Sequence, residues 1–411
     1  MKHRIVVLGA GYAGAIAAGR LAKRLHRDDV AITVVNADAD FVERVRMHQL
    51  ATGQELRERP LGEVYAGTGV RVVVDRVTAV DVERKRVDLA DGDPLDYDTL
   101  VYALGSTGAD QGVPGVAEHA HSLAGKQSAL RLRARLAELP AGAPVVVVGG
   151  GLTGIEAATE IAEARPDLAV SIAARAGVGD WLSDKAQRHL RTVFDRLGIT
   201  VHGHADVTRV TATAVVAGAT EIPAAVTVWT AGFAVHPIAA ATTLTVSDTG
   251  RVVVDATMRS VSHPDVYAVG DAALADGPAG VPLRMACATG SPMAWRAGDA
   301  IAARLTGRPV PDEQIGYATQ CISLGRRDGI LQKVTFDDQP TSTVLTGRLG
   351  ARVKEFICAG AAWSVGHPTL MMPSRRRRIV TTAVEADQLV APCGGDVGDP
   401  AARLGTRPAA G

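Results

Sequence analysis

Two glycine-rich segments have the residue types and spacing that bind the phosphates of a dinucleotide. The first is GAGYAG at residues 9–14, between the apolar run RIVVL and the Ala-rich run AIAAGRLA. Between a strand and a helix, the first glycine permits a tight turn, the second lets a pyrophosphate approach the backbone, and the third lets the helix pack on the strand. Backbone N–H groups and the positive end of the helix then bind the phosphate charge. We therefore predict a dinucleotide site that includes Gly9, Gly11, Tyr12, Ala13 and Gly14.

The second segment, GGGLTG at residues 149–154, repeats this pattern after the run VVVV and before IEAATEIAE. One such segment is typical of a simple dehydrogenase, whereas two in one chain imply two dinucleotides. A flavin and a nicotinamide form a natural pair, because a flavin accepts the hydride that a nicotinamide donates. We expect the second dinucleotide to contact Gly149, Gly151, Thr153 and Gly154.

Three further strand-like segments end in small residues or in an acid. Residues 97–106 (YDTLVYALGS) and 228–232 (VWTAG) end in small-residue turns, and residues 263–271 (HPDVYAVGD) end in Gly-Asp. A carboxylate in that last position is suited to accept hydrogen bonds from a ribityl chain. We predict that these segments add six residues to the cofactor sites: Ala103, Gly105, Ala231, Gly232, Gly270 and Asp271.

This ordered set of motifs resembles the two-dinucleotide-binding-domain flavoproteins with the pyridine nucleotide–disulfide oxidoreductase fold. Within them, the segments FVERVRMHQLATG, YDTLVYALGS and WTAG are most similar to the type II NADH dehydrogenase (NADH:quinone oxidoreductase) branch. The resemblance is good over residues 1–310 and loose beyond them. It implies FAD at the first glycine segment and at Gly270-Asp271, and NAD(P)H at the second. It also implies that a hydride passes from NAD(P)H to FAD, and that the electrons then pass to a small-molecule acceptor.

The elements that position these motifs are those of an α/β protein. Short β-branched runs alternate with longer Ala-rich runs, which predicts parallel sheets covered by helices. We expect two Rossmann-like dinucleotide-binding domains and a small α/β C-terminal domain. Strands are predicted at 4–8, 31–35, 70–74, 99–103, 144–148, 169–173, 226–230, 320–324 and 329–336. Helices are predicted at 14–25, 154–164, 183–197 and 347–359.

The resemblance further implies a discontinuous FAD-binding domain, at residues 1–115 and 249–308, around an NAD(P)H-binding domain at 116–248. The C-terminal domain is expected at 309–380. Residues 381–411 are rich in Gly, Pro and Ala and poor in large apolar residues, so they are predicted to be a disordered tail.

Two positions depart from the acid that usually ends the second strand of such a domain and hydrogen-bonds ribose hydroxyls. The first unit has Asn36 there, so either this amide or Asp38 would make the contact. In the second unit the strand ends at Ala174, followed by Arg175, and a guanidinium without a neighbouring carboxylate suits a 2′-phosphate. We therefore favour NADPH slightly over NADH. The alternative is that Arg175 is exposed surface and NADH binds through other contacts.

Two residues are candidates for roles beside the flavin. His48 lies in a segment that passes close to the flavin in the related family, where it could hydrogen-bond the ring, transfer protons or carry a covalent link. Gln320 begins the segment QCISLGRR, which would face the other side of the flavin. Within that segment, Arg326 or Arg327 would contact an anionic substrate or form a surface ion pair.

The acceptor itself is left open by the motifs. The chain has no Cys-x-x-Cys or Cys-x4-Cys pair, so a dithiol relay is excluded. The Ala-Gln-x-x-x-Gln helix that faces quinone in the related family is also missing, because residues 285–294 read MACATGSPMA. A quinone, a ferredoxin-type protein and a small molecule of specialised metabolism remain as acceptors. A non-enzymatic, redox-sensing flavoprotein is a further alternative.

Composition limits the partners and the compartment. The formal net charge is zero, so no overall field attracts nucleic acid. Four cysteines lie far apart, which suggests a reducing cytoplasm, and we expect no metal site. No apolar run is long enough to span a membrane. Peripheral membrane contact, through FICAGAAWSVGHPTLMMPS and the following four arginines, and homodimer formation are left open.

Overall fold

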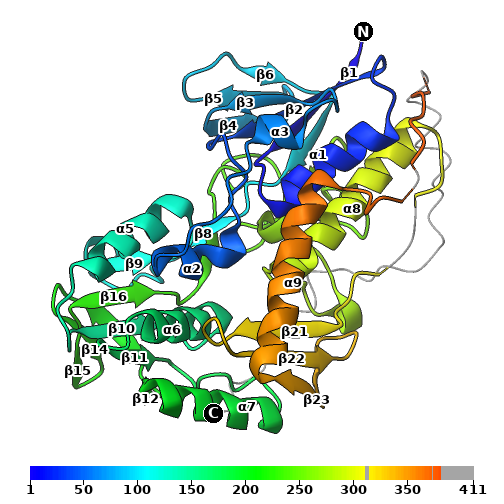
Figure 1. Cartoon of the computed structure of the whole chain (residues 1–411). Helices are drawn as coiled ribbons and strands as arrows, with labels where there is room; N and C mark the ends of the chain where they lie inside the picture. Colours follow the sequence, from blue (N-terminus) through cyan, green and yellow to red (C-terminus); the bar gives the residue numbers. More distant parts are fainter. Residues whose placement is uncertain (311–313, 373, 381–411) are drawn as a thin grey trace.

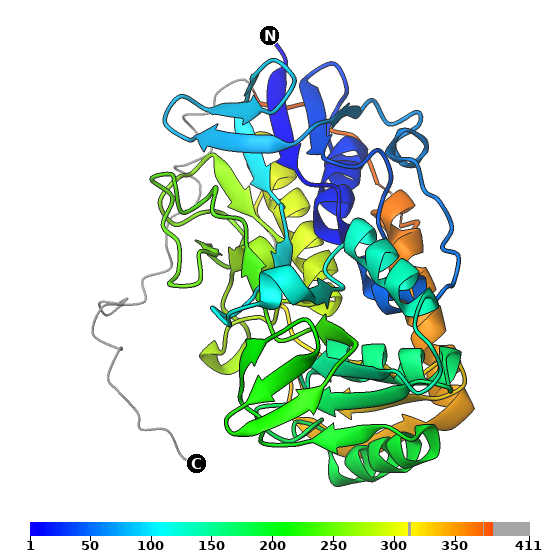
Figure 2. The same ribbon diagram turned by 90° about the vertical axis from the view of Figure 1, so that its left-hand side faces the viewer.

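The computed structural model describes residues 1–310, 314–372 and 374–380, and it confirms an α/β fold with parallel sheets (Figure 1). The predicted tail at 381–411 lies outside the described residues. Two parallel five-stranded sheets, each flanked by helices, form two units that lie one above the other (Figure 2). The central strands of each sheet consist mostly of buried, β-branched residues, as expected for strands covered on both faces.

The first unit contains the chain start and has the strand order β19-β7-β1-β2-β3. Helix α1 (Tyr12–Arg24) follows β1 directly and packs on α8 (Cys287–Leu305). A small antiparallel sheet, β4-β5-β6, lies beside the main one. The strands of this unit are β1 (His3–Leu8), β2 (Val30–Asn36), β3 (Arg71–Val74), β4 (Val77–Asp81), β5 (Arg86–Leu89), β6 (Leu95–Asp96), β7 (Thr99–Tyr102) and β19 (Val266–Ala268).

The second unit has the strand order β12-β11-β10-β16-β9 and repeats the strand–helix start of the first. Helix α6 (Leu152–Ala164) follows β10, and the sheet is also flanked by α5 (Lys126–Ala137) and α7 (Asp184–Leu197). An antiparallel sheet, β13-β14-β15, is attached to it. The strands are β9 (Ala120–Ser122), β10 (Pro144–Val148), β11 (Ala169–Ala173), β12 (Thr200–His202), β13 (Val207–Val210), β14 (Ala214–Ala217), β15 (Thr220–Pro223) and β16 (Val226–Trp229).

Two antiparallel strands connect the units. The chain leaves the first unit through β8 (Ser106–Gly108) and returns through β17 (Phe233–Val235), and these two strands pair. Ala239 and Leu244, which follow β17, are already buried in the core of the first unit. We therefore propose that the first unit resumes by Ala239, somewhat before the boundary near residue 249 that the sequence suggested.

The C-terminal segment packs on both units. Its sheet consists of β21 (Thr319–Ser323), β22 (Gly329–Val334) and β23 (Pro340–Thr346), and is followed by α9 (Gly347–Gly366). Residues of the sheet, such as Ile322 and Ile330, are buried in the core of the second unit. Ala362 and Val365, near the end of α9, are instead buried in the core of the first. Figure 1 shows α9 crossing from one unit to the other and ending beside α1.

The predicted elements are present with small shifts at their ends. Helices α1 and α6 each begin two residues earlier than predicted, because the glycine segments themselves form the first turns. Helix α9 is seven residues longer than predicted, since its final turns pack on the first unit. The remaining short helices and strands are α2 (Met47–Ala51), α3 (Leu61–Val64), α4 (Val116–His119), β18 (Val252–Val253) and β20 (Ala273–Leu274).

Candidate functional site

The first glycine segment forms an open cradle between β1 and α1. A side chain at Gly9, which has φ +91°, would collide with the carbonyl oxygen of Ala103, and one at Gly14 would collide with that of Gly9. At Gly11, by contrast, a Cβ would meet no atom within 4 Å. Two glycines thus serve the packing of the chain, while the middle one leaves open space above the start of the helix. This is the arrangement that a bound pyrophosphate requires.

The second glycine segment has the same geometry between β10 and α6. A Cβ at Gly149, with φ +120°, would lie 2.6 Å from the hydroxyl oxygen of Thr230, and one at Gly154 would collide with the carbonyl of Gly149. Gly151 again has nothing within 4 Å. Thr153 lies in the first turn of α6. The two cradles therefore fit two dinucleotides.

The sheet order brings the other predicted cofactor residues to these cradles. Strands β19, β7 and β1 are neighbours, and so are β10 and β16. Because parallel strands end at the same edge of a sheet, the residues after them meet there. At the first edge Ala103 lies against Gly9 and Gly14, and Gly270 lies against Ala13; at the second edge Ala231 lies against Gly149. Gly105, Asp271 and Gly232 follow the same strands at these edges.

Asp271 is held in place by a hydroxyl and an arginine. Ser106 Oγ donates a hydrogen bond of 2.5 Å to Asp271 Oδ2, and Arg44 Nη2 donates to Ser106 Oγ at 3.0 Å. A Cβ at the preceding Gly270, with φ +71°, would lie 3.1 Å from the methyl group of Ala13. The Gly-Asp turn thus lies against the first cradle, where a carboxylate can accept hydrogen bonds from a bound flavin.

Asn36 shapes the first cradle. Its Oδ1 accepts a 2.9 Å hydrogen bond from the backbone N–H of Ala10, and its Nδ2 donates to the carbonyl of Asp38 at 2.8 Å. The amide therefore fixes the loop that contains the glycines. A contact between Asn36 and a ribose remains a prediction.

Arg175 lies at the surface, at the end of β11. Its side chain is 79% exposed, and its Nε lies 3.0 Å from Asp206 Oδ1 in an ion pair. Such an exposed pair is worth little and opens easily, so the guanidinium is free to turn toward a phosphate.

A buried ionic cluster joins all three parts of the chain. Lys354 Nζ of α9 lies 3.0 Å from Glu156 Oε1 of α6, and the side chains are 10% and 5% exposed. The same carboxylate oxygen accepts a 3.0 Å hydrogen bond from the backbone N–H of Ser323, in β21. His48 Nδ1, in α2, is 3.8 Å from Glu156 Oε2. The cluster thus places charged groups at the junction of the two units and the C-terminal segment.

Burial acts against the charged form of both bases, but the net shifts of their pKa values have opposite directions. Burial lowers the pKa of His48 to about 4, although the charge of Glu156 acts the other way, so this imidazole is neutral at pH 7. Burial also lowers the pKa of Lys354, but the charge of Glu156 more than offsets this, and the pKa lies well above its ordinary value. Lys354 is therefore a permanent cation beside a neutral histidine.

The sequence analysis named His48 as a candidate through the family resemblance, but it named neither Glu156 nor Lys354. The sequence did contain a signal for Glu156. Both Glu156 and Glu160 lie on α6 among buried Ala and Ile residues, where a carboxylate needs a charged or hydrogen-bonding partner. Lys354 carries no comparable local signal. Only the fold brings it to Glu156.

Gln320 lies in a different network. Its Nε2 donates a 3.0 Å hydrogen bond to Asp338 Oδ1, whose other oxygen lies 2.7 Å from Arg284 Nε. The neighbouring Cys321 accepts a hydrogen bond from Lys354 at its carbonyl. Because side chains alternate along a strand, Gln320 and Cys321 face opposite sides. The oxygen of Gln320 is buried and has no hydrogen-bond partner in the described part of the chain, and its catalytic role stays a prediction.

The thiols at this junction are not activated. Cys287, Cys321 and Cys358 are free. Burial raises the pKa of the Cys321 thiol and raises that of Cys358 to about 12, which disfavours the reactive thiolate. Among residues 1–310, 314–372 and 374–380, no group of His, Cys, Asp and Glu could hold a metal ion. No helix in the same ranges could cross a membrane.

Two glycine cradles on two parallel sheets define a protein that binds two dinucleotides. Residues 3–300 match the family model described as pyridine nucleotide-disulphide oxidoreductase. An NADH dehydrogenase-like protein of Mycobacterium tuberculosis is 30% identical over 367 residues, covering 83% of this chain and 91% of the relative. The type II NADH:quinone oxidoreductase NdhA of the same species is 30% identical and covers 68% of each chain.

Solved structures show the same fold. NDH2 from Plasmodium falciparum superposes with a TM-score of 0.75 at 14% identity, covering 90% of this chain and 97% of that one. The sulfide:quinone oxidoreductase of Aquifex aeolicus has a TM-score of 0.72 at 20% identity and covers 89% and 92%. The chain belongs to the pyridine nucleotide-disulphide oxidoreductase family, whose members use FAD and NAD(P)H. It is an NADH dehydrogenase-like flavoprotein oxidoreductase.

Proposed function

We propose that this enzyme holds FAD in the first cradle, oxidises NAD(P)H bound in the second, and reduces a quinone-like small molecule. The two open cradles carry this proposal, because they lie on separate units that meet at the buried cluster of His48, Glu156 and Lys354. In the balanced reaction, NAD(P)H, one proton and a quinone give NAD(P)⁺ and a hydroquinone. FAD, once bound, supplies the reversible uptake and release of two electrons.

Residues of the chain bind and orient the reactants. Backbone N–H groups at Gly11 and Gly151 would bind the two pyrophosphates, and Asp271 would accept hydrogen bonds from the ribityl chain. Lys354, kept protonated by Glu156, would offer its ammonium N–H groups to an acceptor oxygen that becomes negative during reduction. The role of the protein is thus orientation and electrostatics rather than covalent catalysis.

Steady-state assays test this proposal. The purified protein should oxidise NADH or NADPH with menadione as acceptor, and one quinone should be reduced for each nicotinamide. The double reciprocal plots should be parallel if the two substrates react in separate half-reactions. Flavin-loaded protein that reduces neither menadione nor ferricyanide would contradict the proposal.

The nicotinamide is proposed to be NADPH in preference to NADH. Strand β11 ends at Ala173, and the buried Ala174 and then Arg175 follow it, so no carboxylate stands there to repel a 2′-phosphate. The exposed Arg175–Asp206 pair can open to bind that phosphate.

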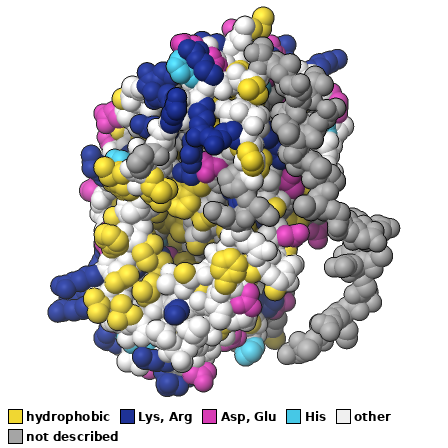
Figure 3. Space-filling view, turned by 90° about the vertical axis from the view of Figure 1, so that its right-hand side faces the viewer, with side chains coloured by type: hydrophobic (Ala, Val, Ile, Leu, Met, Phe, Trp, Pro, Cys, Tyr) yellow, Lys and Arg dark blue, Asp and Glu magenta, His cyan; other side chains and the backbone are white. Residues whose placement is uncertain are grey.

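A second candidate for the acceptor is a quinone dissolved in a membrane, which the protein would reach by peripheral contact. The exposed face of α9 favours this candidate. Leu349, Phe356 and Trp363 recur at seven-residue spacing and are 56%, 78% and 40% exposed. Figure 3 shows apolar side chains gathered in the middle of one face, with Lys and Arg side chains above them. Of the four arginines at residues 375–378, Arg378 forms ion pairs within the chain, with Asp28 and Asp29.

A further inference from the structure

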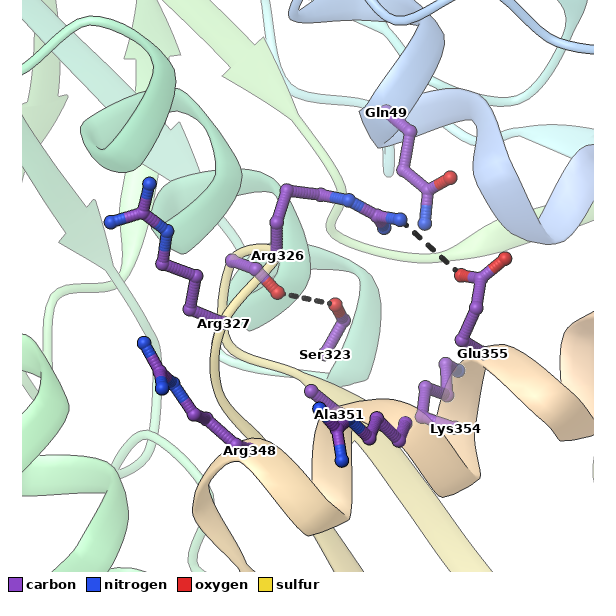
Figure 4. Close-up of a pocket in the computed structure, with 10 residues that line it drawn as sticks. Gln49, Ser323, Arg326, Arg327, Arg348, Ala351, Lys354 and Glu355 are labelled. Atoms are coloured by element: carbon purple, nitrogen blue, oxygen red, sulfur yellow. Dashed lines mark hydrogen bonds and ion pairs between the residues drawn. The ribbon is translucent and has the colours of Figure 1, made fainter.

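An arginine-rich pocket lies beside the buried Glu156–Lys354 pair. Its volume is about 270 Å³, and three elements line it: α2, the turn between β21 and β22, and α9 (Figure 4). Arg326 turns toward Gln49 and Glu355, whereas Arg327 and Arg348 extend together to the other side of the pocket. The polar residues that matter here are Gln49, Arg326, Arg327, Arg348, Arg352 and Lys354.

The positive charge of this pocket is largely uncompensated. Glu355 is its acid, and it is shared between Arg326, at 3.4 Å, and Arg46, at 2.6 Å. Arg327, Arg348 and Arg352 are exposed, and their guanidinium groups make no hydrogen bond or ion pair with any residue that the structure describes. Like charges gathered around one cavity repel one another, and an anion that enters it relieves this repulsion. Guanidinium groups also match the geometry of carboxylate, sulfonate and phosphate oxygens.

The lining of the pocket includes no residue of either glycine cradle. The turn between β21 and β22, which lines the pocket, is attached to the last turn of α6, because the backbone N–H of Arg326 donates a hydrogen bond to Glu163 Oε2. The second cradle lies at the other end of that helix, roughly 16 Å away at a rise of 1.5 Å per residue. Arg175, the candidate for a 2′-phosphate, lies at the end of β11. The arginines are therefore available for another ligand.

The pocket is connected to the buried cluster of His48, Glu156 and Lys354 through its own lining residues. Lys354 both lines it and pairs with Glu156, and Gln49 follows His48 in α2. We propose that the pocket docks the anionic group of the electron acceptor, a small aromatic quinone bearing a carboxylate, sulfonate or phosphate. The ring of this acceptor then faces Lys354. A cavity of this size suits a compact ligand rather than a long isoprenoid tail.

This inference rests on the proposed function, and it leaves the reaction balance unchanged. NAD(P)H, one proton and the quinone give NAD(P)⁺ and the hydroquinone, while the anionic group takes no part in the chemistry. Its binding energy orients the ring, which raises kcat/KM for the charged acceptor.

The test compares anthraquinone-2-sulfonate with the neutral menadione as acceptors. The variant Arg327→Gln/Arg348→Gln removes two guanidinium groups that have no structural partner. Arg188→Gln, at an exposed position on α7, is the control for a change of charge. Comparing the kcat/KM ratio of the two quinones between proteins cancels their different intrinsic reactivities. We expect the ratio to fall about tenfold in the double variant and to stay constant in Arg188→Gln. The Arg327→Lys/Arg348→Lys variant should recover part of the loss.

Binding gives a second readout that does not depend on turnover. Equilibrium dialysis of anthraquinone-2-sulfonate against the oxidised holoenzyme should show weaker retention in the Gln variant, and added salt should weaken retention by the wild type. An unchanged kcat/KM ratio, in protein whose flavin NAD(P)H still reduces anaerobically, would overturn the inference. If the Gln variant lost only its binding to vesicles of anionic lipid and kept its binding of anthraquinone-2-sulfonate, the inference would also be overturned, and the ligand of the arginines would be a lipid headgroup. Failure of NAD(P)H to reduce the flavin would instead refute the proposed function.

Discussion

The ammonium group of Lys354 lies 3.0 Å from a carboxylate oxygen of Glu156, and both side chains are almost completely buried. The pair links α9 of the C-terminal segment to α6 of the second unit. Burying two charges costs solvation energy that their attraction only partly recovers, so such a pair is a poor device for stability alone. Its position next to His48 and the arginine-rich pocket fits the proposed role of Lys354 beside the acceptor.

Replacing Glu156 by Gln should destabilise the protein. The amide oxygen can still accept the hydrogen bond from Ser323, but Lys354 is left as a buried charge without its counter-ion. We expect the free energy of unfolding to fall by about 3–5 kcal/mol. Urea unfolding at pH 7.5 measures it. The variant Glu156→Gln/Lys354→Met, which removes both charges, should recover most of the loss, and a single variant as stable as the wild type would show that the pair is not buried as described.

Stability should fall on mild acidification because of His48. Burial lowers the pKa of this histidine from 6.5 to about 4, so between these values the unfolded chain binds a proton that the folded chain does not. The contribution is complete above pH 6.5 and is lost as the pH falls toward 4, by about 3 kcal/mol in total.

Urea unfolding at pH 7.5 and pH 5 checks this expectation. His48→Gln should remove this part of the pH dependence, whereas His119→Gln, at an exposed histidine, should leave it unchanged. Equal pH slopes for the wild type and His48→Gln would show that His48 titrates normally in the fold.

Substitutions of two glycines in the second cradle should have different effects, one on nucleotide binding and the other on stability. Gly151 is in an extended conformation with open space at its Cβ position, so Gly151→Ala should fold normally but weaken NAD(P)H binding about tenfold. Gly154→Ala would push α6 away from Gly149 and should cost about 1–3 kcal/mol of stability. Thermal unfolding and nucleotide titration measure the two effects. Gly62→Ala, on α3, is the control, and unimpaired binding by Gly151→Ala would place the nucleotide elsewhere.

The features that the sequence predicted are the local ones. Each glycine segment lies within one strand–turn–helix unit, so its residues are close together in the sequence as well as in the fold. The cluster of Glu156, Lys354 and His48 is different, because it forms only when α2, α6 and α9 pack together. Similarly, the segment around Gln320 was placed correctly as a strand, but the packing of the sheet decides which face its side chain occupies. Gln320 bonds to Asp338 and not to the cluster.

The choice of nicotinamide should depend on Arg175. Arg175→Glu places a carboxylate at the end of β11, where it would repel a 2′-phosphate and accept hydrogen bonds from ribose hydroxyls. We expect the ratio of kcat/KM for NADPH to that for NADH to fall at least about tenfold. Asp206→Asn releases Arg175 from its ion pair and should raise the same ratio slightly. If both variants keep the wild-type ratio, Arg175 has no contact with the nucleotide.

Anaerobic titration of the purified, flavin-loaded protein tests the central claim most directly. Its visible absorbance should show the two bands of oxidised flavin, and about one equivalent of NADPH or NADH should bleach them. Gly11→Ala should lower the bound flavin, whereas Gly151→Ala should keep the flavin but require more nicotinamide to reduce it. A colourless protein, or a bound flavin that neither nicotinamide reduces, would contradict the assignment of the two cradles to FAD and NAD(P)H.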